Sequence, residues 1–142
     1  MSYESRIYIV SRNAYKIPKT GEEEHDKEIV NGMVVASFDL CKVGYNNREF
    51  FDAFKTPIDY TLWLPTFDKD GNEVMGEVSD DAYGEHLKSA DLQELIDALQ
   101  IAESREHYRR FAPIIAMLQA FVNDKGAWNN DHEQLQAVHF GY

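Results

Sequence analysis

Hydrophobic and polar residues alternate along two stretches in the N-terminal half of the chain. Residues 6–11 (Arg-Ile-Tyr-Ile-Val-Ser) are rich in β-branched and aromatic types, which predicts a strand. In residues 34–41, Val34, Ala36, Phe38 and Leu40 alternate with Val35, Ser37, Asp39 and Cys41, the period of a strand with one buried face. The segment from Lys16 to Gly32 is rich in turn-forming and acidic residues. It predicts a long connection between the two strands.

The middle of the chain predicts a short helix followed by a β-hairpin. Phe50, Phe51 and Phe54 fall on one face of a helix running from Arg48 to about Lys55. Residues 60–64 and 74–78 flank the turn sequence Asp-Lys-Asp-Gly-Asn-Glu, as two strands of a hairpin would. Pro65 predicts that the first of these strands either ends there or lies at an edge.

The C-terminal half has the three-to-four-residue period of helices. Leu92, Leu95, Ile96 and Leu99 predict one helix, which Asp91 and Glu94 would cap in carboxylate form. A second pattern runs from Tyr108 to Val122 and contains Pro113. This proline predicts either a new helix starting near Ala112 or a kink in a longer one. Residues 135–142 predict a last strand or a docked tail.

Together these patterns predict one α+β domain over residues 1–142. A small antiparallel sheet from the N-terminal half would pack against the C-terminal helical pair. The composition, 44% hydrophobic and 27% charged, is that of a globular domain. The first five residues lack the basic and apolar regions of a secretory signal, so we expect a cytoplasmic protein.

The acidic charge of the chain is concentrated in its middle third. Residues 59–103 contain twelve acidic residues and two lysines, so they carry −10 of the net charge of −11. Such a net charge argues against direct binding to nucleic acid or to an anionic membrane, because the phosphates of both would repel an acidic protein. The acidic residues are therefore concentrated in one region, which predicts an acidic surface formed by residues 59–103.

No catalytic or metal-binding motif emerges from the spacing of reactive residues. A calcium loop starting at Asp68 would place Gly71 fourth instead of sixth and Ser79 twelfth instead of a glutamate. No two of the five histidines have the four-residue spacing of a helical zinc site, and the lone Cys41 has no histidine near it in sequence. We predict no metal, no cofactor and no catalytic residue, and the question of an enzymatic activity stays open.

The basic residues after the first long helix allow two interpretations. Arg105 and Arg109 are four residues apart and would share a helix face. They could form a clamp for an anionic small ligand, or they could pair with the acidic segment of the same chain. The candidate ligand-binding residues are Arg105, His107, Tyr108, Arg109 and Arg110.

The acidic segment is the strongest candidate for a functional surface. Its carboxylates could be a solvated face that keeps the protein soluble. Alternatively, they could imitate the charge spacing of a nucleic-acid backbone and bind the basic groove of a partner protein. The candidate partner-binding residues are Asp68, Asp70, Glu73, Glu77, Asp80, Asp81 and Glu85.

The small size, the acidic surface and the opening Tyr3-Glu4-Ser5-Arg6-Ile7-Tyr8-Ile9-Val10 resemble phage-encoded accessory proteins of the anti-CRISPR type. The resemblance is one of type and carries over no functional residue. It implies a soluble inhibitor, acting in the bacterial host cytoplasm, that blocks the nucleic-acid-binding groove of a defence nuclease. One alternative is a small-ligand-binding protein or minor enzyme whose pocket is formed by Arg105, His107 and Arg109 with the aromatic residues Trp63 and Tyr108. The other is a structural subunit of a larger assembly.

Overall fold

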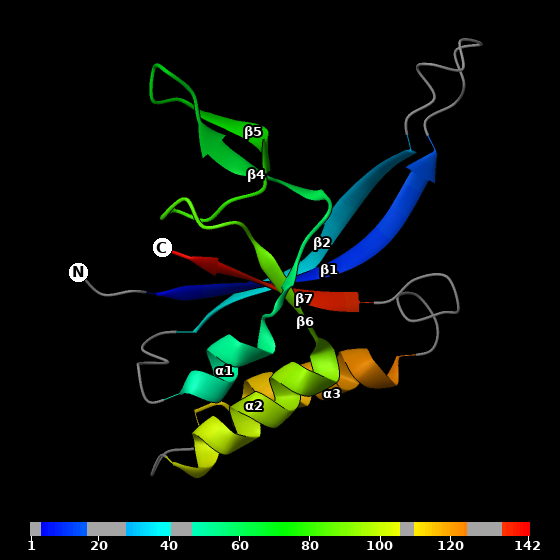
Figure 1. Ribbon diagram of the computed structural model, residues 1–142, viewed down its shortest axis with the longest axis vertical. Helices are drawn as coiled ribbons and strands as arrows, with labels where there is room; N and C mark the ends of the chain where they lie inside the picture. The colour runs from blue at the N-terminus through cyan, green and yellow to red at the C-terminus, as the bar shows by residue number, and fades with distance from the viewer. Residues whose placement is uncertain (1–3, 17–27, 41–46, 106–109, 125–134) are drawn as a thin grey trace.

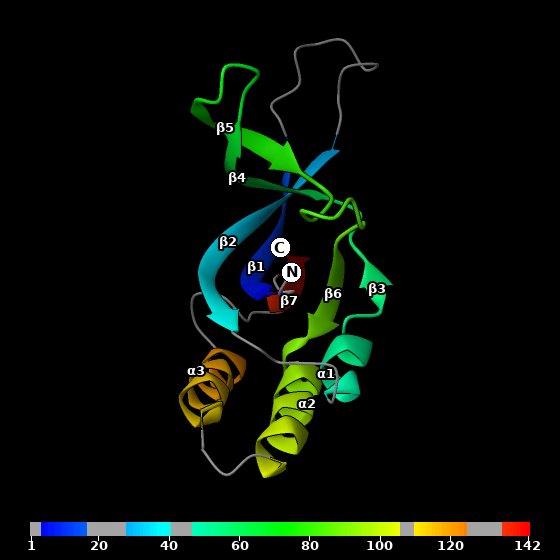
Figure 2. The ribbon, with the colours of Figure 1, turned by 90° about the vertical axis from the view of Figure 1, so that its left-hand side faces the viewer.

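The computed structural model describes residues 4–16, 28–40, 47–105, 110–124 and 135–142. Within them, seven strands form one mixed sheet in the order β3-β6-β7-β1-β2-β4-β5, with three helices at one end (Figures 1 and 2). The elements are β1 (Ser5–Lys16), β2 (Glu28–Leu40), α1 (Arg48–Ala53), β3 (Thr56–Pro57), β4 (Thr61–Phe67), β5 (Glu73–Val78), β6 (Lys88–Asp91), α2 (Leu92–Ser104), α3 (Ala112–Asn123) and β7 (Leu135–Gly141).

The two N-terminal strands are confirmed, but both are longer than predicted. β1 and β2 pair antiparallel from Ser5↔Leu40 to Lys16↔Glu28, so the expected connection from Lys16 to Gly32 is wrong at both ends. Residues 17–27, its remainder, lie outside the described residues. Gly32 lies in β2, and a Cβ at this position would lie 2.6 Å from the Tyr60 ring. Glycine at this position serves close packing rather than a turn.

A bulge in the β1–β2 pair changes which face Val34 occupies. The register shifts between Ile9 and Val10, so Val34 packs with the cluster on the opposite face from Ala36 and Phe38. The predicted alternation therefore holds for Ala36, Phe38 and Leu40 and is wrong for Val34. A bulge inserts one residue and reverses the side-chain phase beyond it.

The predicted hairpin is confirmed as β4 and β5, which pair antiparallel from Leu62↔Val78 to Phe67↔Glu73. Pro65 does not end β4, but it lies where this strand forms an edge, which is the second of the two predicted alternatives. β4 pairs with β2 only at Thr61 and Leu62, so along Pro65 it has the single neighbour β5. The missing N–H of proline is harmless there.

The sequence patterns missed two short strands, β3 and β6, and left the C-terminal segment undecided. Residues 135–141 form β7, which lies between β6 and β1 in the interior of the sheet. The sheet is therefore neither small nor purely antiparallel, because it has seven strands and β2 pairs parallel with β4. The α+β class itself is confirmed.

The three predicted helices are present. α2 buries Leu92, Leu95, Ile96 and Leu99, as its period predicts, and α3 begins at Ala112 with Pro113 in its first turn. The predicted carboxylate capping box of α2 is wrong in its detail, since the Asp91 side chain makes no cap hydrogen bond. Asp91 is also the last residue of β6, whose pairing with β7 fixes the start of the helix. In the described residues, no helix combines the length and the apolar character needed to cross a bilayer.

Two apolar clusters lie on the two faces of the sheet. On one face, α1, α2 and α3 cover Ile7, Ile9 and Ala137. On the other face, Tyr8, Val10 and Val138 pack against apolar residues of β4 and of the segments before β4 and β6. These residues are Ile58, Tyr60, Leu62, Leu64 and Leu87. The β4–β5 hairpin projects at the end of the molecule opposite the helices (Figure 1).

Candidate functional site

The acidic segment contains two turns of the same construction, one at the hairpin tip and one after β5. Asp68 Oδ1 accepts hydrogen bonds from the N–H groups of Asp70 and Asn72, both at 2.9 Å. Asp81 Oδ1 accepts them from Tyr83 at 2.8 Å and Glu85 at 3.0 Å. Each turn closes on a glycine with positive φ, Gly71 at 81° and Gly84 at 79°. Asp68 and Asp81 therefore shape the loops that display the neighbouring acids.

One face of the hairpin exposes large apolar side chains. Residues opposite each other on antiparallel strands share a face, so Trp63, Pro65 and Phe67 lie beside Glu77, Met75 and Glu73 respectively. Trp63 is 59% exposed, Phe67 76% and Met75 49%, whereas Leu62 and Leu64 on the opposite face are buried. We call Trp63, Pro65, Phe67, Glu73, Met75 and Glu77 the hairpin outer face. An exposed aromatic patch with a charged rim is typical of a protein-binding surface.

The acids on and beside this face are not neutralised within the described part of the chain. Asp70, Glu73 and Glu77 are exposed and form no ion pair with a described residue. Lys69 is the single basic residue among positions 68–85. Asp80 Oδ1 lies 3.5 Å from His86 Nδ1, a pair that is charged only if the histidine is protonated. The hairpin thus presents uncompensated negative charge.

The twelve acids of residues 59–103 do not form one patch. The candidate partner-binding residues lie on the hairpin and on the turn after β5, whereas Asp91, Glu94, Asp97 and Glu103 lie at the start of α2 or within it. Figures 1 and 2 place the hairpin and α2 at opposite ends of the molecule. Within the first group, the hairpin acids adjoin the hairpin outer face, whereas Asp81 and Glu85 line a cavity together with Phe51 and Phe54 of α1.

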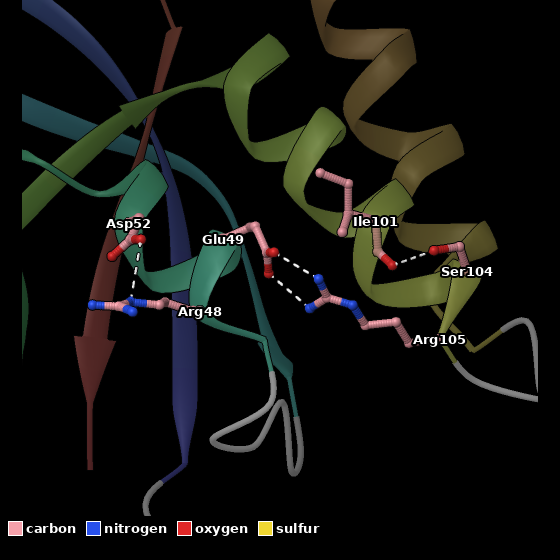
Figure 3. Close-up of polar contacts among 6 residues, drawn as sticks. All are labelled: Arg48, Glu49, Asp52, Ile101, Ser104 and Arg105. Carbon is pink, nitrogen blue, oxygen red and sulfur yellow. Dashed lines mark hydrogen bonds and ion pairs between the residues drawn. The ribbon is translucent and has the colours of Figure 1, made fainter.

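The predicted basic cluster is only partly described. Arg105 Nη1 and Nη2 donate to the two carboxylate oxygens of Glu49, at 2.8 and 2.6 Å, and so link α2 to α1 (Figure 3). This guanidinium lowers the pKa of the Glu49 carboxyl to about 2. Glu49 lies outside the acidic segment of residues 59–103, so this contact is not the pairing with that segment that the sequence predicts. Arg110 lies over the Phe111 ring, 4.4 Å from its centroid, and His107, Tyr108 and Arg109 are outside the described residues.

A groove of about 460 Å³ borders the Trp63 end of the hairpin outer face. Two of its lining residues are paired, since Arg6 Nε donates to Asp39 Oδ1 at 2.7 Å, and this bond raises the pKa of Arg6. The groove is lined by Arg6, Tyr8, Val34, Ser37, Phe38, Asp39, Trp63, Leu64 and Pro65. It extends the exposed surface of the hairpin toward the β1–β2 pair.

A smaller cavity of about 180 Å³ is lined by Phe51, Phe54, Asp81, Glu85, His86, Lys88 and His139. His139 Nε2 lies 2.8 Å from Ser5 Oγ, and its ring contacts Phe50, Phe51 and Phe54 of α1. Burial lowers the pKa of His139 to about 4, so its imidazole is neutral at pH 7. The cavity is smaller than the 300 Å³ or so of ordinary ligand pockets, which favours a packing role for this histidine.

No group of three or more His, Cys, Asp or Glu side chains suited to a metal ion occurs in the part of the chain that the structure describes. Cys41 lies outside that part, as do the three adjacent residues Asp131, His132 and Glu133, whose side chains are of metal-ligating types.

Sequence reasoning identified the acids of the surface but missed its apolar half. Trp63 alternates with buried Leu62 and Leu64, and this period of two is a signal that the sequence contains. Met75 has no such signal, because its neighbour Val74 is also exposed. Comparisons with protein-family models, with curated proteins and with solved structures give no match for this chain.

Proposed function

We propose that this chain is an interaction protein that binds a basic surface of a partner protein through the hairpin outer face and the acids around it. The observation that carries the proposal is the combination of exposed Trp63, Phe67 and Met75 with unneutralised Glu73 and Glu77 on one face. A few hot-spot residues carry most of the binding energy of an interface, and tryptophan is one of the residue types enriched among them. The surrounding carboxylates would steer a cationic partner and orient it.

The position of this face supports the same function. The hairpin projects away from the helices, so a partner could contact it without disturbing the main apolar core (Figure 2). The turns at Asp68 and Asp81 are closed by internal hydrogen bonds, which reduces the conformational entropy lost on binding. The two turns are therefore preorganised for binding.

The partner class we propose is a nuclease of bacterial defence whose basic groove normally holds nucleic acid. The resemblance to anti-CRISPR accessory proteins supports this class, and the acidic character of the hairpin fits such a groove. Asp68, Asp70, Glu73, Glu77, Asp80, Asp81 and Glu85 would face the basic residues of the groove. Binding there would exclude the nucleic acid and inhibit cleavage.

The test compares two triple charge reversals with the same change in net charge. One carries Asp70→Lys, Glu73→Lys and Glu77→Lys on the hairpin, and the control carries Asp52→Lys, Glu94→Lys and Asp97→Lys on α1 and α2. Association with purified RNA-guided nucleases, and inhibition of their DNA cleavage, would be measured over a series of salt concentrations. We expect the hairpin variant to lose binding and the control to retain it, with wild-type binding weakening as salt rises.

Equal inhibition by the wild type and the hairpin variant would contradict the proposal. Equal loss in both variants would also contradict it, since it would indicate a response to net charge rather than to this surface. Asp68 is left unchanged because its carboxylate closes the turn and its loss would alter the hairpin itself.

A further inference from the structure

The free edge of the sheet at β5 has a defined set of backbone groups facing outward. β5 is the last strand in the order of the described sheet. Asp68 N donates to Asn72 O, which makes Asp68/Asn72 a hydrogen-bonded pair and Phe67/Glu73 a non-hydrogen-bonded one. The alternation then makes Pro65/Met75 non-hydrogen-bonded, as the missing N–H of proline requires. The N–H and C=O groups of Glu73, Met75 and Glu77 consequently point away from β4.

This edge is open over a short and well-defined length. After β5, Leu87 N donates to Ser79 O, so the chain closes its own edge at that point. Between Glu73 and Glu77 no backbone hydrogen bond from another described segment covers the edge. β5 (Glu-Val-Met-Gly-Glu-Val) contains no proline or lysine, the residues that usually block strand addition.

The side chains beside the open edge specify the chemistry of an added strand. Glu73, Met75 and Glu77 lie on the hairpin outer face, with one acid on either side of an apolar residue. Residues directly opposite on an added antiparallel strand would share this face, so opposite charges and apolar contact favour basic, apolar and basic residues at every second position. A second copy of this chain pairing about Met75 would instead bring the glutamates of the two copies together.

We infer that the partner binds by adding an extended antiparallel strand to β5, with Lys or Arg opposite Glu73 and Glu77 and an apolar residue opposite Met75. This inference rests on the proposed function and specifies how the same surface recognises its partner. Backbone hydrogen bonds to β5 would give part of the affinity, and the alternate side chains would give specificity.

A synthetic peptide can test the strand directly. The probe is a seven-residue peptide of threonine with lysine at the second and sixth positions and valine at the fourth, and the control has the same composition with the two lysines adjacent. Binding to the full chain would be followed by amide chemical shifts in NMR titrations. We expect the probe to bind more tightly than the control and to shift the amides of Glu73, Met75 and Glu77 most.

Backbone modification separates strand addition from simple charge attraction. N-methylation of the probe's valine removes an N–H that would face β5, whereas N-methylation of the neighbouring threonine removes one that faces solvent. We expect the first to weaken binding about tenfold and the second to leave it nearly unchanged. On the protein side, Met75→Pro removes an outward N–H, and Met75→Ala removes the side chain alone, so the proline variant should bind more weakly.

Three results with the peptides would overturn the inference. They are equal binding of the probe and the control peptide, equal effects of the two N-methylations, and no binding of the probe. In each case the charge-reversal experiment still decides the proposed function separately, since hairpin acids could act through side chains alone. Sedimentation of the free chain tests the self-paired alternative, and a dimer lost in Met75→Pro would also overturn the inference.

Discussion

The two ends of this molecule are both acidic, but they use their carboxylates differently. At the helical end, Glu49 binds Arg105 through two hydrogen bonds and Glu94 lies 3.6 Å from Lys55. At the hairpin end, Glu73 and Glu77 have no cationic partner among the described residues and lie beside exposed aromatic rings. Acids at the first end join elements of the fold, whereas acids at the second remain available to another molecule.

The largest expected effect is a difference in the free energy of unfolding between substitutions at the helical end and at the hairpin end. Leu99 in α2 is fully buried, so Leu99→Ala should reduce the free energy of unfolding by about 2–5 kcal/mol. Phe67 on the hairpin outer face is mostly exposed, so Phe67→Ala should change it by no more than about 0.5 kcal/mol. Urea denaturation of both variants measures the difference. A cost for Phe67→Ala similar to that of Leu99→Ala would mean that the hairpin face belongs to the core.

The pH dependence of stability should report the packing of His139 under α1. Its pKa falls from 6.5 to about 4 on folding, so the unfolded chain binds the proton more readily. Stability is complete above pH 6.5 and should decrease by about 3 kcal/mol as the pH falls to 4. The variant His139→Gln should lose this slope, and Glu49→Gln should retain it above pH 4.5. Unfolding measured at several pH values would contradict the assignment if His139→Gln kept the wild-type slope.

Removing the indole of Trp63 tests the hairpin outer face as an interface. Trp63→Ala should weaken partner binding by about 2 kcal/mol, roughly thirtyfold, as expected for an aromatic hot spot. The matched control is Ile101→Ala, which removes an exposed apolar side chain from α2 at the other end (Figure 3). Calorimetric titration with an inhibited nuclease would measure both. An equal loss in the two variants would remove the distinction between the ends.

The smallest expected effect is that of the Arg105–Glu49 ion pair. Both side chains are well solvated, so screening leaves such a pair with little effect on stability. Arg105→Ala should lower the melting temperature less than Leu99→Ala does, and high salt should reduce the difference further. A large, salt-independent loss would show that this arginine packs α2 against α1 rather than pairing charges.

Local periodicity was sufficient to predict most elements of the fold. The strands around Ile7 and Phe38, the hairpin around Gly71 and the helices at Leu95 and Leu118 follow directly from the spacing of apolar residues. β6 was missed because four residues carry too little alternation to be distinguished from a loop. Asn31 and Gly32 belong to the predicted connection but lie in β2, where the glycine accommodates the Tyr60 ring, a contact between residues far apart in sequence.

The candidate site also has features that the sequence predicts and features that depend on the tertiary structure. The acids of residues 68–85 could be named from composition, but their separation from the acids of α2 depends on the path of the chain. Trp63, Phe67 and Met75 could be assigned to strands, but their exposure depends on what covers each face. The Asp68 and Asp81 turns share the spacing Asp-x-x-Gly, a local signal that the sequence does contain.

The sequence by itself determined the α+β class, the acidity of the middle third and the hairpin that carries part of it, because these depend on residue type and near-neighbour spacing. The tertiary structure decided that β7 lies inside the sheet, that β5 lies at its edge, and that Arg105 binds Glu49. It also decided that aromatic and acidic residues share one exposed face. Strand order and cross-strand pairing join residues distant in sequence, and no local pattern specifies which of the available partners is chosen.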